Sequence, residues 1–146
     1  MSDPLFPQAA KHTFHEIETG VSTSQQIQIT ENMIDRFAEL SGDFSPIHIH
    51  RNTAVERGFK DRVSHGFLTG ALISRVIGMT LPGEYGLLHS TTLQFHKPVY
   101  VGDLLTISVT VKDKQEAFLL VFLDVSVTNQ QSDVVCKGKI QMGLSR

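Results

Sequence analysis

The chain of 146 residues has little of what marks exported or membrane-spanning proteins. Its single cysteine, Cys136, excludes an internal disulfide and fits a reducing compartment, so we expect a cytoplasmic location. The longest apolar-rich stretch, residues 67–81, is too short for a bilayer and is interrupted by polar residues such as Ser74 and Arg75. Residues 1–4 include an acid and lack the charged-then-apolar pattern of an export signal.

The charge distribution and the absence of certain motifs argue against further classes of protein. The formal net charge is −2 and no run of like charges stands out, so neither a nucleic-acid partner nor a membrane surface is expected. The sequence has no Gly-x-Gly-x-x-Gly, P-loop or Cys-x-x-Cys pattern, which leaves nucleotide and zinc chemistry without support. Cys136 lies in a strand-like run of apolar residues, which favours a small buried residue over a nucleophile.

The spacing of apolar residues changes along the chain, from a helical period in the first part to alternation in the second. The first part predicts short strands over residues 14–19 and 22–29, followed by a helix with Thr30 as its N-cap and Gly42 at its end. A capping-box pattern that begins at Thr53 then predicts a second, short helix.

A third and longer helix is predicted to run from an N-cap at Ser64 through Met79. Its apolar positions cover most of its circumference, so we expect it to be buried on most sides. The period then changes to two, which predicts four long strands over residues 88–95, 104–111, 118–128 and 134–142.

Two of the links between these strands are short and polar, so the strands should be antiparallel neighbours. The expected fold class is therefore α+β, with an antiparallel sheet wrapped around one long central helix. We expect a polar lead-in over residues 1–13 and a single domain over residues 14–146.

The most informative motif is the turn from Gly42 to His48. Gly42 permits backbone geometry that other residues resist, and Pro46 fixes its own φ. A rigid turn that holds Asp43 and His48 together suits positioned acid–base chemistry. A carboxylate just after a helix C-terminus is poorly placed for stability, which favours a functional role. The alternative is an Asx-turn in which Asp43 binds backbone amides near Ser45.

A second motif, Ser64-His65-Gly66, opens the long helix. The first amides of a helix lack intrahelical partners, so the Gly66 N–H is a candidate oxyanion donor, although glycine here could equally serve close packing. A triad of Ser64, His65 and Asp43 is conceivable, but no nucleophile elbow surrounds the serine. His48-x-His50 invites a metal interpretation, which lacks a third ligand at a familiar spacing.

The segment from residue 37 to His48, together with residues 65–68, resembles the MaoC-like hydratases, and most closely the (R)-specific enoyl-CoA hydratases. Their signature runs Gly-Asp-x-Asn-Pro-aliphatic-His. The resemblance implies the hot dog fold, in which an antiparallel sheet wraps a long central helix. It also implies a homodimer or higher homo-oligomer that binds an acyl-CoA or acyl-carrier-protein thioester, with no metal or redox cofactor.

The resemblance further implies residue roles. Asp43 and His48 would activate the water that adds to a trans-2-enoyl thioester, or would act in the reverse dehydration, and the Gly66 amide would bind the thioester oxygen. We expect substrate contacts from Ser45, Ser64, His65 and Ser74.

Two residues depart from the family pattern: Ser45 replaces Asn, and His50 stands where an Asp is often found. These departures keep open the alternative of a non-catalytic module that binds acyl thioesters. A hot dog thioesterase is a second alternative, and the Asp-x-Ser-Pro-x-His turn argues against it.

Overall fold

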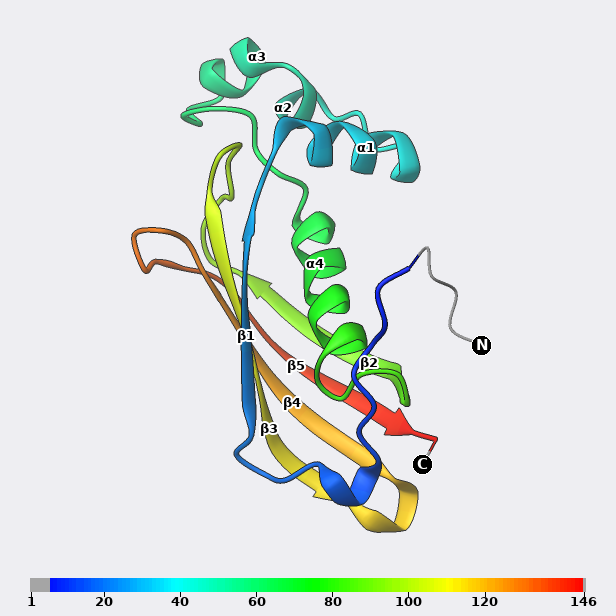
Figure 1. The fold of residues 1–146 in the computed structure, drawn as a ribbon. Helices are drawn as coiled ribbons and strands as arrows, with labels where there is room; N and C mark the ends of the chain where they lie inside the picture. Colours follow the sequence, from blue (N-terminus) through cyan, green and yellow to red (C-terminus); the bar gives the residue numbers. More distant parts are fainter. Residues whose placement is uncertain (1–5, 146) are drawn as a thin grey trace.

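The structure, a computed structural model, describes residues 6–145 (Figure 1). Its helical elements are η1 (Phe14–Glu16), α1 (Glu31–Ser41), α2 (Pro46–Ile49), α3 (Arg51–Glu56), α4 (Gly66–Met79) and η2 (Glu116–Phe118). Its strands are β1 (Ser22–Gln28), β2 (Gly86–Phe95), β3 (Leu104–Gln115), β4 (Leu120–Thr128) and β5 (Val134–Leu144).

The strands form one antiparallel sheet in the order β1-β3-β4-β5-β2, and the sheet curls around α4 (Figure 1). The helices α1, α2 and α3 gather beyond one end of α4, on the same side of the sheet. This arrangement confirms the α+β class and the hot dog architecture. Within residues 6–145, none of the helices is both long enough and apolar enough to cross a membrane.

The core lies between α4 and the concave face of the sheet. Alternate residues of β3 and β4 are buried while those between them are half-buried, because successive side chains of a strand point to opposite faces. The buried apolar residues of α4 that complete this core are Leu68, Leu72, Ile73, Val76 and Ile77. Cys136 is fully buried in the same core, which confirms it as a packing residue.

The strand predicted over residues 14–19 is wrong, because η1 occupies its start. The Thr13 N–H donates to Glu16 Oε2 at 2.8 Å, and this reciprocal capping box closes a short helical turn instead of an extended chain. The Ala10 N–H donates to the Met79 carbonyl at 2.9 Å, which ties the described part of the lead-in to the end of α4. Residues 1–5 of that lead-in lie outside the described residues.

The predicted limits of α1 are confirmed. The Met33 N–H donates to Thr30 Oγ1 at 3.2 Å, and Gly42 has a left-handed φ of 76° with its N–H bonded to the Ala38 carbonyl at 2.8 Å. A positive φ of this kind is easily adopted only by glycine. The helix therefore ends at Ser41, and its C-cap Gly42 directly precedes Asp43.

Two other predicted helix starts are wrong. The helix α3 begins at Arg51 with His50 as its N-cap, and α4 begins at Gly66 with His65 as its N-cap. Ser64 Oγ instead donates to the His65 carbonyl at 3.4 Å.

The helix α4 is also less enclosed than predicted. In the single chain, one side of the helix is exposed, and Phe67 keeps 78% of its surface accessible. Strand β2, which lies at the edge of the sheet, is exposed over most of its length.

Candidate active site

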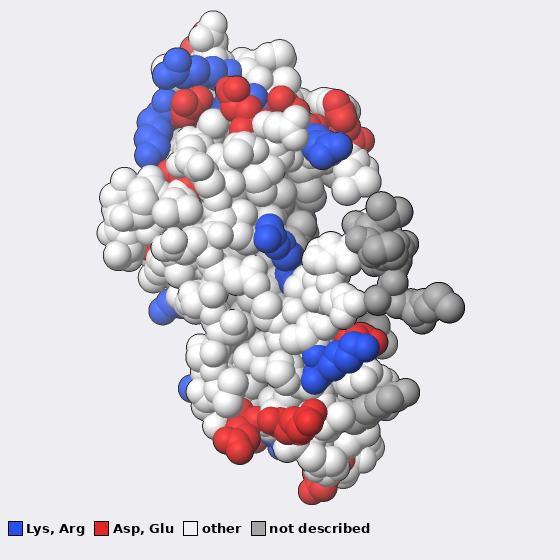
Figure 2. Space-filling view, viewed as in Figure 1, with Lys and Arg blue, Asp and Glu red and all other residues white. Residues whose placement is uncertain are grey.

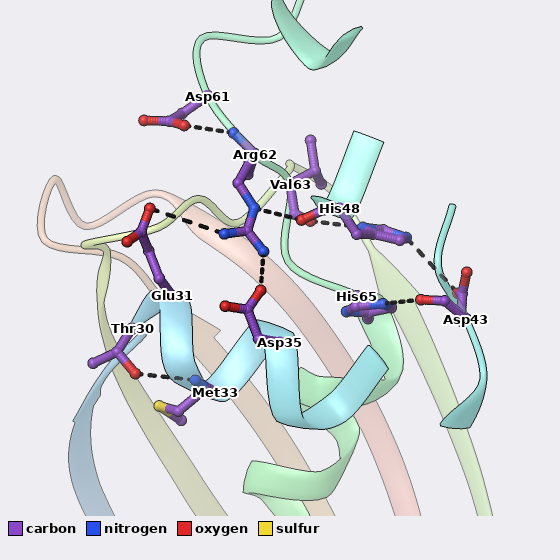
Figure 3. A network of polar contacts seen from close by, with 10 residues as sticks. All are labelled: Thr30, Glu31, Met33, Asp35, Asp43, His48, Asp61, Arg62, Val63 and His65. Atoms are coloured by element: carbon purple, nitrogen blue, oxygen red, sulfur yellow. Dashed lines mark hydrogen bonds and ion pairs between the residues drawn. The ribbon is translucent and has the colours of Figure 1, made fainter. Parts of the chain in front are cut away.

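The turn after α1 carries the candidate acid–base pair. The Ser45 N–H donates to Asp43 Oδ1 at 3.1 Å, which is the Asx-turn contact considered above as the alternative role for this carboxylate. Pro46 then opens the four-residue helix α2, which the sequence did not predict. This short helix holds His48 one turn after Ser45, so that its imidazole faces back toward Asp43 (Figure 3).

The pair is close but not in direct hydrogen-bond contact. His48 Nε2 lies 3.8 Å from Asp43 Oδ2, and the side chains are 12% and 51% exposed respectively. His48 Nδ1 lies 2.6 Å from the Val63 carbonyl. A carbonyl only accepts, so Nδ1 carries the proton in the neutral ring and the lone pair of Nε2 is directed toward the carboxylate.

His65 joins this pair from the N-terminus of α4. Its Nε2 donates to the Asp43 carbonyl at 2.9 Å, and its ring stacks on His48 with centroids 3.9 Å apart. His65 is 2% exposed, and its Nδ1 has no hydrogen-bond partner within the described residues. The turn motif and the helix-start motif, which are 22 residues apart in sequence, thus meet in one cluster.

Potential ligand atoms of Asp43, His48 and His65 lie within 4.8 Å of one another. However, His65 Nε2 is occupied as a donor, and the two imidazole planes are stacked at 27° instead of converging on one point. Metal ligands direct lone pairs at a shared centre, so the arrangement fits a hydrogen-bonded acid–base cluster better than a metal site. His50, the second histidine of the His-x-His pattern, is exposed and takes no part in this cluster.

Arg62 is a buried residue beside the cluster that the sequence gave no reason to select (Figure 3). Its Nε donates to the His48 carbonyl at 2.6 Å, and its guanidinium also pairs with Asp35 and approaches Glu31 at 3.9 Å. Arg62 thereby joins α1 to α2, because both acids belong to α1. The only sequence signal was an arginine two residues before the helix-start motif.

Gly66 is the first residue of α4 and lines a pocket of about 300 Å³ together with His48 and Ser64. A Cβ at Gly66 would lie 3.3 Å from the Phe95 ring, so glycine permits this close approach. Lys97, on the same wall, pairs with Asp133 at 2.9 Å. The Lys97 hydrogen bond holds the pKa of the Asp133 carboxyl below its usual value.

Ser45 and Ser74, the remaining residues predicted to contact the substrate, lie in different parts of the structure. Ser45 is half-buried beside Asp43, whereas Ser74 lies on the exposed side of α4. Ser74 lines a second, almost entirely apolar pocket of about 410 Å³ together with Phe37, Phe67 and Leu88. No contact of these serines with a substrate is established, so their roles stay predictions.

Comparison with known proteins identifies the family. The chain matches the family described as MaoC like domain over residues 12–133, and it belongs to this family.

The individual relatives carry related names. The chain is 40% identical to an (R)-specific enoyl-CoA hydratase from Rhodospirillum rubrum, over 68% of its own length and 69% of that protein. It is 34% identical to a 3-hydroxybutyryl-CoA dehydratase from Methylorubrum extorquens, over 75% and 69% respectively. Among solved structures, R-hydratase PhaJ1 from Pseudomonas aeruginosa superposes with a TM-score of 0.88 at 32% identity, covering 94% of this chain and 88% of that one.

Proposed function

We propose that this protein catalyses the (R)-specific hydration of trans-2-enoyl-CoA, together with the reverse dehydration of (R)-3-hydroxyacyl thioesters. The observation that carries the proposal is the separation of 3.8 Å between Asp43 Oδ2 and His48 Nε2, with the His48 tautomer fixed by Val63. Two acceptors at this spacing can each receive one proton of the same water molecule.

The proposed chemistry follows from that arrangement. A water molecule that donates to both Asp43 and His48 directs an oxygen lone pair away from them, toward the β-carbon of a bound enoyl thioester. As the carbon–oxygen bond forms, Asp43 takes a proton from the water, and the Asp43–His48 pair returns a proton to the α-carbon on the same face. One water is consumed, and the thioester bond stays intact.

Gly66 has the complementary role in this proposal. Charge develops on the thioester oxygen as water adds, and the Gly66 N–H would donate to it. The position of Gly66 at the start of α4, in the pocket that it shares with His48, supports this role. Loss of one such donor typically costs about 10²–10³ in rate. We assign Ser45 to the polar surroundings of the pair, Ser64 to the pocket wall and Ser74 to the apolar pocket that would hold the acyl chain.

We further propose that the active form is a homodimer. Strand β2 forms an edge of the sheet, and Leu87, Leu88 and Phe95 on it are 67%, 46% and 50% exposed. Charged residues gather at the two ends of the molecule in Figure 2, whereas the middle of this face, over α4 and β2, is mostly uncharged. An antiparallel edge can pair with a second copy of itself across a two-fold axis.

The test is a hydration assay with crotonyl-CoA and longer trans-2-enoyl-CoA substrates. The expected result is loss of the enoyl chromophore with an (R)-3-hydroxyacyl product, and loss of most of this rate in Asp43→Asn, which keeps size and removes charge. Release of free CoA, read with a thiol reagent, would identify a thioesterase instead. Tight binding of the thioester without turnover would identify a binding module.

A further inference from the structure

We infer that His65 is a positioning residue, which holds the main chain of Asp43 and the ring of His48 in their reacting arrangement and does not itself contact the substrate. The inference rests on the proposed function and replaces the substrate-binding role expected for His65 from the sequence.

The first support is the bond to the main chain of Asp43. Asp43 lies in an exposed turn, and the contacts of its carboxylate are the Ser45 N–H and the more distant His48. The bond of 2.9 Å from His65 Nε2 to the Asp43 carbonyl connects this turn to the N-terminus of α4, where His65 itself is buried. The Asp43 backbone is therefore fixed from the core, and rotation about its side-chain bonds is the main freedom left.

The second support is the contact of the His65 ring with two other aromatic rings. One side contacts His48, with centroids 3.9 Å apart, and the ring also contacts Phe37 at 4.9 Å and an interplanar angle of 54°. The stack fixes the plane of the His48 imidazole, while the bond to the Val63 carbonyl fixes its rotation within that plane. His65 thus restrains both members of the candidate pair at the same time.

The third support is the nitrogen that has no partner. His65 Nδ1 is buried without a hydrogen bond within the described residues, an arrangement that folded proteins largely avoid. A phenylalanine would fill the same space without a buried acceptor, so packing alone does not explain a histidine here. Among rings small enough for this space, only histidine combines a flat surface for the stack with an N–H that can donate to the Asp43 carbonyl.

The experiment compares His65→Phe, which keeps a ring and removes the donor, with His65→Gln, whose amide nitrogen reaches a similar position. We expect His65→Phe to lower kcat by about 10–100-fold, the scale of a small misplacement of reacting groups, while KM changes by less than about threefold. Its melting temperature should not fall, because the unpartnered Nδ1 is removed as well. His65→Gln, which restores the donor but not the stacked ring, should recover only part of the lost kcat.

Three results would overturn the inference. These are a raised KM with kcat unchanged, which indicates substrate contact; loss of stability in parallel with activity in both variants; and wild-type kcat in His65→Phe.

A readout independent of activity separates this inference from the proposed function. Nitrogen-15 spectra of histidine-labelled protein report the tautomer of each ring, and signals are assigned by their loss in His65→Gln and His48→Ala. We expect the Nε2–H form for His65 and the Nδ1–H form for His48. An Nδ1–H form of His65 would overturn the inference whatever the activity. The expected tautomers in a wild-type protein without hydration activity would refute the proposed function and leave the positioning contact supported.

Discussion

At the scale of single residues, Asp43 and His48 are proposed to act on one water molecule, and groups that act as a unit do not contribute additively. We expect Asp43→Asn and His48→Ala each to lower the hydration rate by about 10²–10⁴, the range for a lost acid–base group. The double variant should be little slower than the slower single variant. Rates of all three variants under saturating substrate test this.

Circular dichroism of the same samples is the control for folding, since Asp43 is exposed and His48 is held by neighbouring main chain. Clean additivity of the two losses would mean that the residues act in separate steps. Near-normal turnover of Asp43→Asn would mean that Asp43 only stabilises the turn, through the bond that it accepts from the Ser45 N–H.

Ser45 lies beside the candidate pair and replaces the Asn of the family signature. Its N–H binds Asp43 Oδ1, and its side chain is half-buried at the start of α2. We expect Ser45→Asn to raise turnover or leave it level, because an amide both donates and accepts. Steady-state kinetics of the purified variant measure this. A clear loss of turnover in a folded protein would instead show that the site is adapted to serine.

Cys136 gives a prediction that concerns packing and not the reaction. Burial raises the pKa of its thiol, and the residue is fully enclosed in the core. Because thiolate is the reactive form, a raised pKa and lack of access both slow alkylation. We expect no modification by iodoacetamide at pH 8 in the native protein and complete modification in denaturant, as measured by mass spectrometry. Rapid native labelling would contradict the buried position.

At the scale of elements, Arg62 connects α2 to α1, because its guanidinium contacts residues of both helices. We expect Arg62→Met to lower the hydration rate by about 10–100-fold, because the His48 carbonyl loses its donor and the ring can shift. The unpaired acceptor should also cost about 1–3 kcal/mol of unfolding free energy. Kinetics and urea unfolding measure the two effects.

Asp35→Asn is the matched control for this prediction. It removes an ion pair whose acid is 52% exposed and leaves the bond between Arg62 and His48 in place. Partly exposed ion pairs contribute only about 0–1 kcal/mol, so activity and stability should change little. An equal effect of both substitutions would mean that the ion pair, and not the contact with the carbonyl, positions α2.

The elements also show what the sequence could predict. The alternation in β3 and β4 and the caps of α1 depend on local side-chain patterns, and these predictions are confirmed. The helix α2 has four residues, which is too short for a periodic signal, and the contacts of Arg62 span 14 to 31 residues along the chain. Ser64 was selected as a cap by propensity, but its hydroxyl bonds its neighbour's carbonyl instead.

At the scale of the whole molecule, the proposed dimer places the exposed apolar surface of β2 between two copies. We expect Leu88→Lys to give a folded monomer with little hydration activity, because Leu88 is 46% exposed and lines the apolar pocket beside α4. Sedimentation velocity at micromolar concentration measures the change in mass.

Thr110→Lys is the control for the added charge, since Thr110 lies on the other face of the sheet opposite Asp124. This variant should keep the mass and activity of the wild type. A wild-type protein that sediments as a monomer with full activity would refute the dimer proposal.

The helix α4 has a consequence for the length of the substrate. Gly66, the proposed partner of the thioester oxygen, is its first residue, and Ser74 lies eight residues further along. At 1.5 Å per residue, the two positions are separated by about 12 Å along the helix axis. If the acyl chain follows the helix from one pocket to the other, the distance along α4 sets the length of acyl chain that the site can hold. Larger side chains at small positions of the apolar pocket, such as Ala71, would then shorten the longest chain the enzyme accepts.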